Sequence, residues 1–450
     1  MNADQLWQLL FDPPNAQWFE QRLDHFNPTD TRTWKQRYFK AGPDSSDTLF
    51  VKICGETEAL PLWMVAGMWT RWGQKHNAVR LQLEHRFYGD SRPTKDMSVD
   101  NLQYLSSEQA LADVAIFISS MKRQYRASKV IAFGGSYSGA LAAWFRLKYP
   151  HLVDGAVASS APVHPQMNFK GYLEVVAKSL NTFKPVNACD DAISAATAAL
   201  KEKLKSAEGR KALKEQFNLC DDIDISAKKD INNLFRTLAG NVMNTVQYNK
   251  VVGGIPTIDD LCGIMIDKSQ GDELARYAKT SDLVLKGKCV DFKYDKLIQD
   301  LKNVTGWDMT RYFGDRQWTY QTCTEFGGFL TSDSIAQPFG HEFPIEFSVQ
   351  ICIDVFGSKF NSKFISGAVD ASNVNYGGRH YTEDRVVFVN GNIDPWHYLS
   401  ITHKLPQARV IYIDGTAHCA DAMDPDPESD PPGLARARKV IGDLIDQWLQ

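Results

Sequence analysis

The 450-residue sequence contains no long apolar run, no long basic run and no internal repeat. Its longest stretch without a charged residue lies between Lys129 and Arg146, which is too short, and too rich in glycine and serine, to form a membrane-spanning helix. The formal net charge of −4 gives no electrostatic reason to expect nucleic acid or a membrane as a partner. With 43% hydrophobic and 23% charged residues, the composition is that of a globular domain.

The eight cysteines include no Cys-x-x-Cys pair and no neighbouring histidine cluster, so we predict neither a metal site nor a cofactor. Six of them fall between Cys189 and Cys352, and Asn303 begins a glycosylation sequon. The amino terminus lacks the basic, apolar and small-residue sections of a secretory signal. These features favour a secretory protein whose signal peptide has been removed over a cytosolic protein with six reduced cysteines.

Strand-like and helix-like segments alternate in the first third of the chain. Ser106-x-x-Gln109 reads as a capping box that opens a helix. The apolar positions that follow are spaced 3, 4, 3 and 4 residues apart and predict one buried stripe: Leu111, Val114, Ile118, Met121 and Tyr125. Strand patterns occur at 34–39, 49–54, 78–84, 130–133 and 155–160. This order predicts a parallel sheet covered by helices.

Helix-like runs and most of the cysteines occupy the middle of the chain, where strand patterns are scarce. Strand patterns return at 385–390 and 409–413, and a final helix is expected to bury Leu434, Ala437, Ile441, Leu444 and Trp448. We therefore predict an α/β domain made of residues 1–164 and 341–450. A mainly helical cap of residues 165–340 would be inserted into it.

Residues 130–145 resemble the nucleophile elbow of an α/β-hydrolase. An apolar, β-branched run stops at Gly134, and a helix-favouring run begins at Ala140, so that Ser136 stands at a sharp strand-to-helix turn. Small residues must flank such a serine because the helix backbone presses against the strand. Ser138 occupies a position where the usual pattern has glycine. A plain Gly/Ser loop between a strand and a helix would have the same sequence pattern, so the rest of the chain must distinguish the elbow from such a loop.

A base and an acid that could serve Ser136 follow the two late strands. Asp394 comes after the strand at 385–390 and His418 after the strand at 409–413, at the strand ends where such sheets place their sites. Alone, Asp394 would be an ordinary turn residue and His418 a loop histidine. Together they complete the order Ser, Asp, His of α/β-hydrolases, so we predict a catalytic triad.

Several segments carry a resemblance to a known family that runs nearly end to end. They are Gln17-Trp18-Phe19, Leu23 to Phe26, Leu83 to Gly89, Gly134 to Tyr137, Trp318 to Gly327, Asn390 to Trp396 and Ala417 to Cys419. The chain resembles the serine peptidases that include prolylcarboxypeptidase, dipeptidyl peptidase II and the thymus-specific serine peptidase, and is most similar to the last. The resemblance implies an α/β-hydrolase fold, the same triad and an endosomal, lysosomal or secreted location.

The oxyanion hole is expected to use the backbone N–H of Tyr137 and a second N–H at Gly55 or Glu56. Relatives have Gly-Gly-Glu-Gly there, whereas this chain has Cys54 and Thr57 on either side of Gly55-Glu56, a departure that leaves the level of activity open. Ser136 would attack, His418 would move the proton and Asp394 would orient the histidine.

A pocket that binds a proline ring needs flat apolar walls, and Trp396, two residues after Asp394, is placed to form one of them. The aromatic-rich stretch 312–329, with Tyr320 and Glu325, is expected to supply others. The alternative for Trp396 is plain core packing. The resemblance also implies three disulfides, Cys189–Cys262, Cys220–Cys289 and Cys323–Cys352, leaving Cys54 and Cys419 unpaired; the sequence alone allows other pairings.

These observations predict a serine peptidase whose cap admits only chain ends, hence an exopeptidase, and the resemblance implies cleavage after proline near one end of short peptides. The alternatives are an esterase or lipase on the same fold and a peptide-binding protein with weak catalysis. The charged, cysteine-bearing insertion is unlike the apolar lid of a lipase. The sequence leaves open which peptide end is recognised and whether the chain forms a homodimer.

Overall fold

The computed structural model describes residues 14–307 and 314–450. Its centre is an eight-stranded sheet with the strand order β1-β2-β4-β3-β5-β6-β9-β10. The strands are β1 Gln17–Arg22, β2 Thr33–Ala41, β3 Thr48–Ile53, β4 Val79–Leu83, β5 Lys129–Gly135, β6 Gly155–Ser159, β9 Val386–Gly391 and β10 Arg409–Ile413. This is the α/β-hydrolase fold expected from the sequence.

The expectation of a parallel sheet is correct for six strands and wrong at one edge. β4, β3, β5, β6, β9 and β10 run parallel, but β1 pairs antiparallel with β2, and β2 antiparallel with β4. The chain between β1 and β2 is too short for a crossover, so it can only turn back and pair antiparallel. The parallel strands bring their carboxyl ends to one edge, where the site forms.

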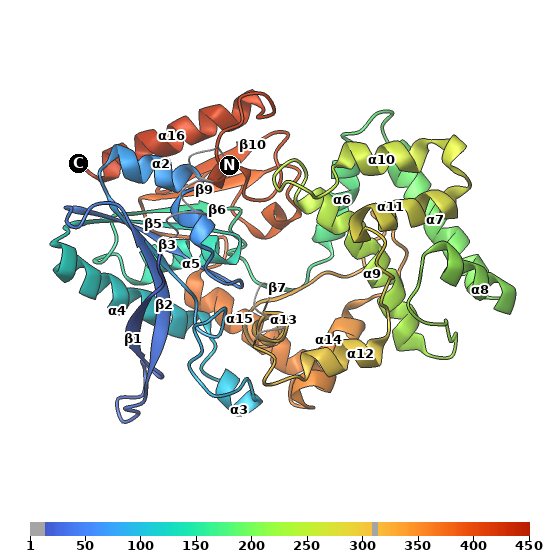
Figure 1. Cartoon of the computed structure of the whole chain (residues 1–450), viewed down its shortest axis with the longest axis horizontal. Coiled ribbons are helices and arrows are strands. Elements are labelled where there is room, and N and C mark those ends of the chain that lie inside the picture. The colour runs from blue at the N-terminus through green and yellow to red at the C-terminus, as the bar shows by residue number, and fades with distance from the viewer. Residues whose placement is uncertain (1–13, 308–313) are drawn as a thin grey trace.

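Helices cover both faces of the sheet (Figure 1). One face packs on α2 (Met68–Lys75) and α16 (Pro432–Trp448), and the other on α4 (Ser107–Tyr125) and α5 (Tyr137–Lys148). All five positions of the predicted α4 stripe are buried. Of the five predicted α16 positions, four are buried and Leu444 is half-buried. The capping box is half formed: Ser106 accepts from the Gln109 N–H, but the Gln109 side chain donates to Asp24 instead.

A helical cap forms the right half of Figure 1. Its elements are α6 Gly171–Leu180, α7 Ala188–Leu204, α8 Ala207–Gln216, α9 Lys228–Gln247, α10 Ile258–Ile266, α11 Glu273–Leu285 and α12 Tyr294–Leu301. α14 (Ile345–Phe356) adds its apolar side chains to the same core, so the helical part extends beyond residue 340, where the sequence suggested that it would end. α15 (Ser362–Tyr376) then leads back to the sheet, with Tyr376 packed beside α5.

Three disulfides join the expected pairs, Cys189–Cys262, Cys220–Cys289 and Cys323–Cys352. Cys54 and Cys419 are free, also as expected. The first bridge joins α7 to α10, and the second joins the loops that follow α8 and α11. The third links α14 to the turn that follows α13 (Asp315–Gln321). Each closed loop restricts the unfolded chain, which contributes about 2–4 kcal/mol to stability.

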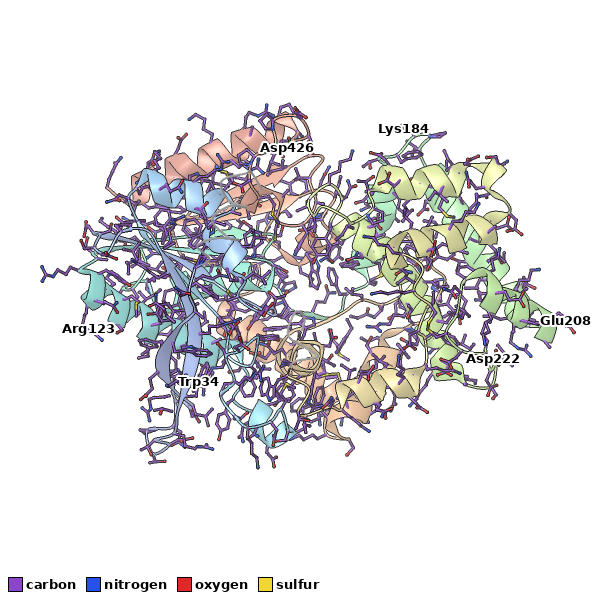
Figure 2. The ribbon with its side chains drawn as sticks, viewed as in Figure 1. Trp34, Arg123, Lys184, Glu208, Asp222 and Asp426 are labelled. Atoms are coloured by element: carbon purple, nitrogen blue, oxygen red, sulfur yellow. A yellow bond between two sulfur atoms is a disulfide. The ribbon has the colours of Figure 1, made fainter. Side chains whose placement is uncertain are left out.

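The molecule is elongated, and its two halves meet at the carboxyl ends of the strands. Figure 2 labels Arg123 of α4 toward one end and Glu208 of α8 at the other. Two short strands, β7 (Gln166–Asn168), just before the cap helix α6, and β8 (Gly327–Phe329), pair in a second sheet. In the described residues no helix is both long and apolar enough to cross a membrane.

Candidate active site

Ser136 stands at the strained turn between β5 and α5. Its backbone has φ 62° and ψ −133°, a conformation that L-residues rarely adopt. A Cβ on Gly134 would lie 1.9 Å from the backbone oxygen of Ser138, and one on Gly139 would lie 2.6 Å from that of Ser159. Only glycine therefore fits these two positions, because strand and helix backbones touch there. This geometry is that of a nucleophile elbow.

Ser138 occupies a position that is usually glycine, and its side chain stabilises the turn through hydrogen bonds that glycine could not make. Its hydroxyl accepts from the Gly135 N–H at 2.9 Å and donates to the Gly135 carbonyl at 2.8 Å. The side chain therefore folds back on the elbow and does not crowd Ser136. This departure from the usual pattern is accommodated by a local hydrogen-bonded turn.

Asp394 and His418 are joined as the triad prediction requires. His418 Nδ1–H donates to Asp394 Oδ2 at 2.9 Å, and both side chains are buried. The other carboxylate oxygen of Asp394 accepts from the Trp396 N–H at 2.9 Å, which fixes the carboxylate at the start of its turn. Burial disfavours a charged imidazole, but the Asp394 carboxylate outweighs it and raises the pKa of His418 well above its usual value.

Ser136 and His418 line the same cavity of about 270 Å³. Within residues 14–307 and 314–450, no hydrogen bond joins the Ser136 hydroxyl to His418. Because Asp394 holds the Nδ1 proton, the Nε2 atom of His418 is the one left to act as a base. Hydrogen bonds of this kind often tighten only when substrate is bound. The structure thus brings the three predicted residues together, with the Ser–His contact still to be closed.

The predicted oxyanion donors also surround Ser136. Tyr137 is the first residue of α5, so its N–H belongs to the group that an α-helix leaves without an internal partner. Gly55 lies against the elbow: a Cβ there would be 3.1 Å from the Ser138 nitrogen and 3.3 Å from the Tyr137 ring. Glu56 lines the cavities on both sides of Ser136. Burial raises the pKa of its carboxyl group.

A second cavity, of about 220 Å³, opens on the other side of Ser136 and is bounded by aromatic rings. Trp396 forms one wall, as predicted, and Trp318 of α13 forms another. The Trp396 indole donates to the Gln247 side chain at 2.9 Å, and its ring packs on Phe169 and Tyr172. Trp396 therefore lines this cavity and is also partly packed in the core, and its role as a wall for the substrate stays a prediction.

Two predicted pocket residues do not line these cavities. Tyr320 is buried and packs edge-on against Phe356 and Phe360 in the cap core. Glu325 lies behind the elbow, where it accepts from the Ser107 hydroxyl at 2.6 Å and from Gln321 at 3.0 Å. α13 turns Trp318 to the cavity and Tyr320 to the core, and Glu325 lies in the π-helical turn Thr322–Phe326 that follows α13, so neither predicted pocket residue lines these cavities. Residues 312 and 313 of the predicted stretch lie outside the described residues.

The cap contributes two site residues that sequence reasoning missed. Gln247 lies at the end of α9. Its backbone carbonyl accepts from the backbone N–H of His418 at 3.0 Å, and its side-chain oxygen accepts from the Trp396 indole and the Tyr172 hydroxyl. The Tyr248 ring packs edge-on against His418, with ring centroids 6.0 Å apart. No local pattern marks these positions, since the contact depends on how the cap folds over the sheet.

Two further groups surround His418. Cys419 lies beside the elbow, where a Cβ on Gly135 would be 2.9 Å from its sulfur. Asp421 accepts from the Ser159 hydroxyl at 2.6 Å. Burial raises the Asp421 pKa to about 6, against the lowering effect of that hydrogen bond. The described residues contain no group of three or more His, Cys, Asp or Glu side chains that could hold a metal ion.

Comparison with known proteins places this geometry in a family. Residues 21–441 match the family described as serine carboxypeptidase S28. The chain belongs to this family. It is 36% identical to the thymus-specific serine protease of Mus musculus, over 97% of this chain and 88% of that protein. The human protein of the same name is 33% identical over 97% and 87%. The human lysosomal Pro-X carboxypeptidase is 27% identical over 96% and 88%.

Family membership makes the chain a serine-type peptidase. The family therefore favours a peptidase over the esterase and peptide-binding alternatives. The predicted glycosylation of Asn303 stays a prediction. Asn303 is partly buried after α12, and its side-chain oxygen accepts from the Thr305 N–H at 3.1 Å.

Proposed function

We propose that this protein is a serine exopeptidase that hydrolyses the peptide bond after proline, near one end of a short peptide. Ser136 attacks the carbonyl carbon while His418 accepts its proton, and the Tyr137 and Gly55-Glu56 N–H groups bind the oxyanion. His418 then protonates the leaving amine, and water hydrolyses the ester on Ser136 by the same steps. The strained Ser136 backbone, in one cavity with the Asp394-oriented His418, is the observation that carries this proposal.

The preference for proline rests on the 220 Å³ cavity and on the relatives. Trp396, Trp318, Pro162 and Tyr137 give it flat apolar walls, which suit a compact ring without an N–H. The name of the Pro-X carboxypeptidase states such a preference for that relative. The cap closes over His418 through Gln247 and Tyr248, which favours chain ends over folded proteins.

The same relatives and the three disulfides favour the secretory route, and we propose an endosomal or lysosomal location. Short peptides are then the partners of the site.

Two assays test the proposed activity. A fluorophosphonate should label wild-type protein at Ser136. Short peptides that differ only in the residue before the scissile bond should be cleaved at least tenfold faster with proline than with leucine. Equal rates for proline and leucine would contradict the specificity. Rapid cleavage in the middle of long peptides blocked at both ends would contradict the exopeptidase activity, and absence of labelling would contradict the nucleophile itself.

A further inference from the structure

The Tyr137 side chain lies buried between α13 and the loop expected to carry the second oxyanion donor. Its ring packs on the rings of Trp318 and Phe326, with centroids 5.6 and 5.1 Å apart. The same ring would lie 3.3 Å from a Cβ on Gly55. A shift of the Tyr137 ring would therefore move the two expected donors relative to each other.

The Tyr137 hydroxyl is held by two buried side chains. His85, in the turn after β4, and Gln321, the last residue of α13, each place a nitrogen 3.0 Å from it. His85 Nδ1 lies 2.7 Å from the Arg86 carbonyl, which can only accept, so Nδ1 carries the ring proton. Burial lowers the pKa of His85 to about 4, so the imidazole is neutral at neutral pH. The Tyr137 hydroxyl therefore donates to His85 Nε2 and accepts from the Gln321 amide.

The orientation of the Gln321 amide is determined by its other partners. Gln321 Oε1 accepts from the Tyr88 hydroxyl at 2.6 Å, and Gln321 Nε2 donates its second proton to Glu325 at 3.0 Å. The other Glu325 oxygen accepts from the backbone N–H and the hydroxyl of Ser107, at 2.8 and 2.6 Å. A reversed amide would place its oxygen against two oxygens, one of Glu325 and one of Tyr137, whose proton is already donated. One amide orientation is thus selected.

This network has no direct access to the substrate. It comes from two of the segments that carry the family resemblance, and the triad uses neither of them. In the parts of the chain that the structure describes, four of its side chains line neither cavity beside Ser136: His85, Tyr88, Gln321 and Glu325. Any effect of these side chains on the reaction must therefore pass through Tyr137.

We propose that His85 and Gln321 are positioning residues, which hold the Tyr137 hydroxyl so that the Tyr137 backbone N–H points at the oxyanion. This inference rests on the proposed function, which assigns that N–H to the oxyanion. Tyr137 directly follows the strained Ser136 backbone, so the turn gains an anchor from its side chain. An oxyanion donor acts on charge that develops in the transition state, so a misdirected N–H slows turnover more than it weakens substrate binding.

Tyr137→Phe removes the hydroxyl and keeps the ring. It should lower kcat by roughly 10–100-fold, less than or equal to the loss of a whole oxyanion donor, with KM changed about twofold or less. Affinity for a prolinal analogue of the acyl part of a cleaved peptide, whose adduct with Ser136 carries an oxyanion, should weaken by a similar factor. Affinity for the matched prolinol, which forms no adduct, should stay the same.

Two further variants test the holding residues. Gln321→Met removes the donor to Tyr137 and should reproduce the selective loss of prolinal affinity. His85→Gln can still accept from the Tyr137 hydroxyl, so it should keep more of kcat than His85→Leu.

Tyr381→Phe is the matched control. It also removes one buried hydroxyl bonded to α5, since Tyr381 donates to the Ala143 carbonyl at 2.8 Å, but this bond lies away from the elbow. Its melting temperature should fall about as much as that of Tyr137→Phe, while kcat and prolinal affinity stay unchanged.

Three results would overturn the proposal: unchanged kcat and prolinal affinity in Tyr137→Phe, equal weakening of prolinal and prolinol in that variant, or the same kinetic loss in Tyr381→Phe. Failure of the proposed function is distinct, because wild-type protein would then cleave no proline peptide and would bind prolinal no more tightly than prolinol.

Discussion

At the level of single residues, two serines two positions apart have different surroundings. Ser136 has a strained backbone and faces both cavities, whereas the Ser138 hydroxyl is used in two hydrogen bonds to Gly135. Ser136→Ala should leave the protein folded and lower kcat by about 10⁴–10⁶-fold, as expected when a nucleophile is removed. Ser138→Ala should cost no more than about 1–2 kcal/mol of stability and keep turnover.

The measurements are peptide hydrolysis and thermal unfolding of both variants. The assignment of the nucleophile would be wrong if Ser138→Ala lost turnover while Ser136→Ala retained it.

Asp394 determines both the orientation and the basicity of His418. Asp394→Asn removes the charge that raises the pKa of His418, so that pKa should fall. A base works only when neutral, and the acid limb of kcat/KM should therefore move to lower pH in the variant. The variant should also lose about 10³–10⁴-fold in kcat, because an amide can hold the imidazole in the wrong tautomer.

A pH profile of kcat/KM from pH 4 to 9, for wild type and Asp394→Asn, tests this linkage. An acid limb that stayed in place or moved to higher pH would contradict it. His397, which follows the same strand as Asp394, offers a control: its Nδ1 lies 3.2 Å from the Gly391 carbonyl and it lines neither cavity. His397→Gln should therefore leave the acid limb unchanged.

At the level of elements, α13 carries a cavity residue and a core residue within three positions. Trp318 lines the proline-sized cavity, whereas Tyr320 is buried against Phe356 and Phe360. Trp318→Ala should raise KM for proline peptides by tenfold or more with a small change in melting temperature. Tyr320→Ala should instead cost about 3–5 kcal/mol of unfolding free energy, because it opens a cavity in the core.

Steady-state kinetics and thermal unfolding of the two variants test this division, with kcat/KM corrected for the fraction of protein labelled by a fluorophosphonate. Equal kinetic effects of the two substitutions would show that α13 does not divide its faces in this way.

The same helix shows how far the sequence could predict the site. The triad was predictable because each member directly follows a strand, and parallel strands bring those turns to one edge. The wall residue of α13 was not, because a seven-residue helix has too few positions to show which face it turns to the site. Gln247 could not be predicted for another reason. It contacts Trp396 across a sequence separation of 149 residues, and this contact depends on how the cap packs.

Lys52, which lines the 270 Å³ cavity, illustrates the remaining gap. In the sequence it is the one charged residue of an otherwise apolar strand pattern at 49–54. Its environment is created by α2, which covers that face of β3, and by the absence of a nearby carboxylate among the described residues. The antiparallel edge strands escaped prediction similarly, since strand patterns give no direction of pairing.

At the level of the whole molecule, buried acids near the active site link stability to pH. Asp421 is 3% exposed, and burial raises its pKa from 3.8 to about 6. Between about pH 4 and pH 6 the Asp421 carboxyl is therefore protonated in the folded state and ionised in the unfolded chain. This group stabilises the fold fully below about pH 4, and the contribution is lost as pH rises through about 6, which amounts to about 3 kcal/mol.

Asp421→Asn should remove this dependence, because an amide does not titrate in that range and can still accept from Ser159. The free energy of unfolding of wild type, relative to the variant, should therefore fall by about 3 kcal/mol between pH 4 and pH 7.5. Urea unfolding with the disulfides intact measures it, and exposed Asp191→Asn on α7 is the matched control. A difference between wild type and Asp421→Asn that stays constant with pH, or grows in favour of wild type as pH rises, would contradict the linkage. The expected sign suits a peptidase that works in an acidic compartment, since the fold is then most stable where Asp421 keeps its proton.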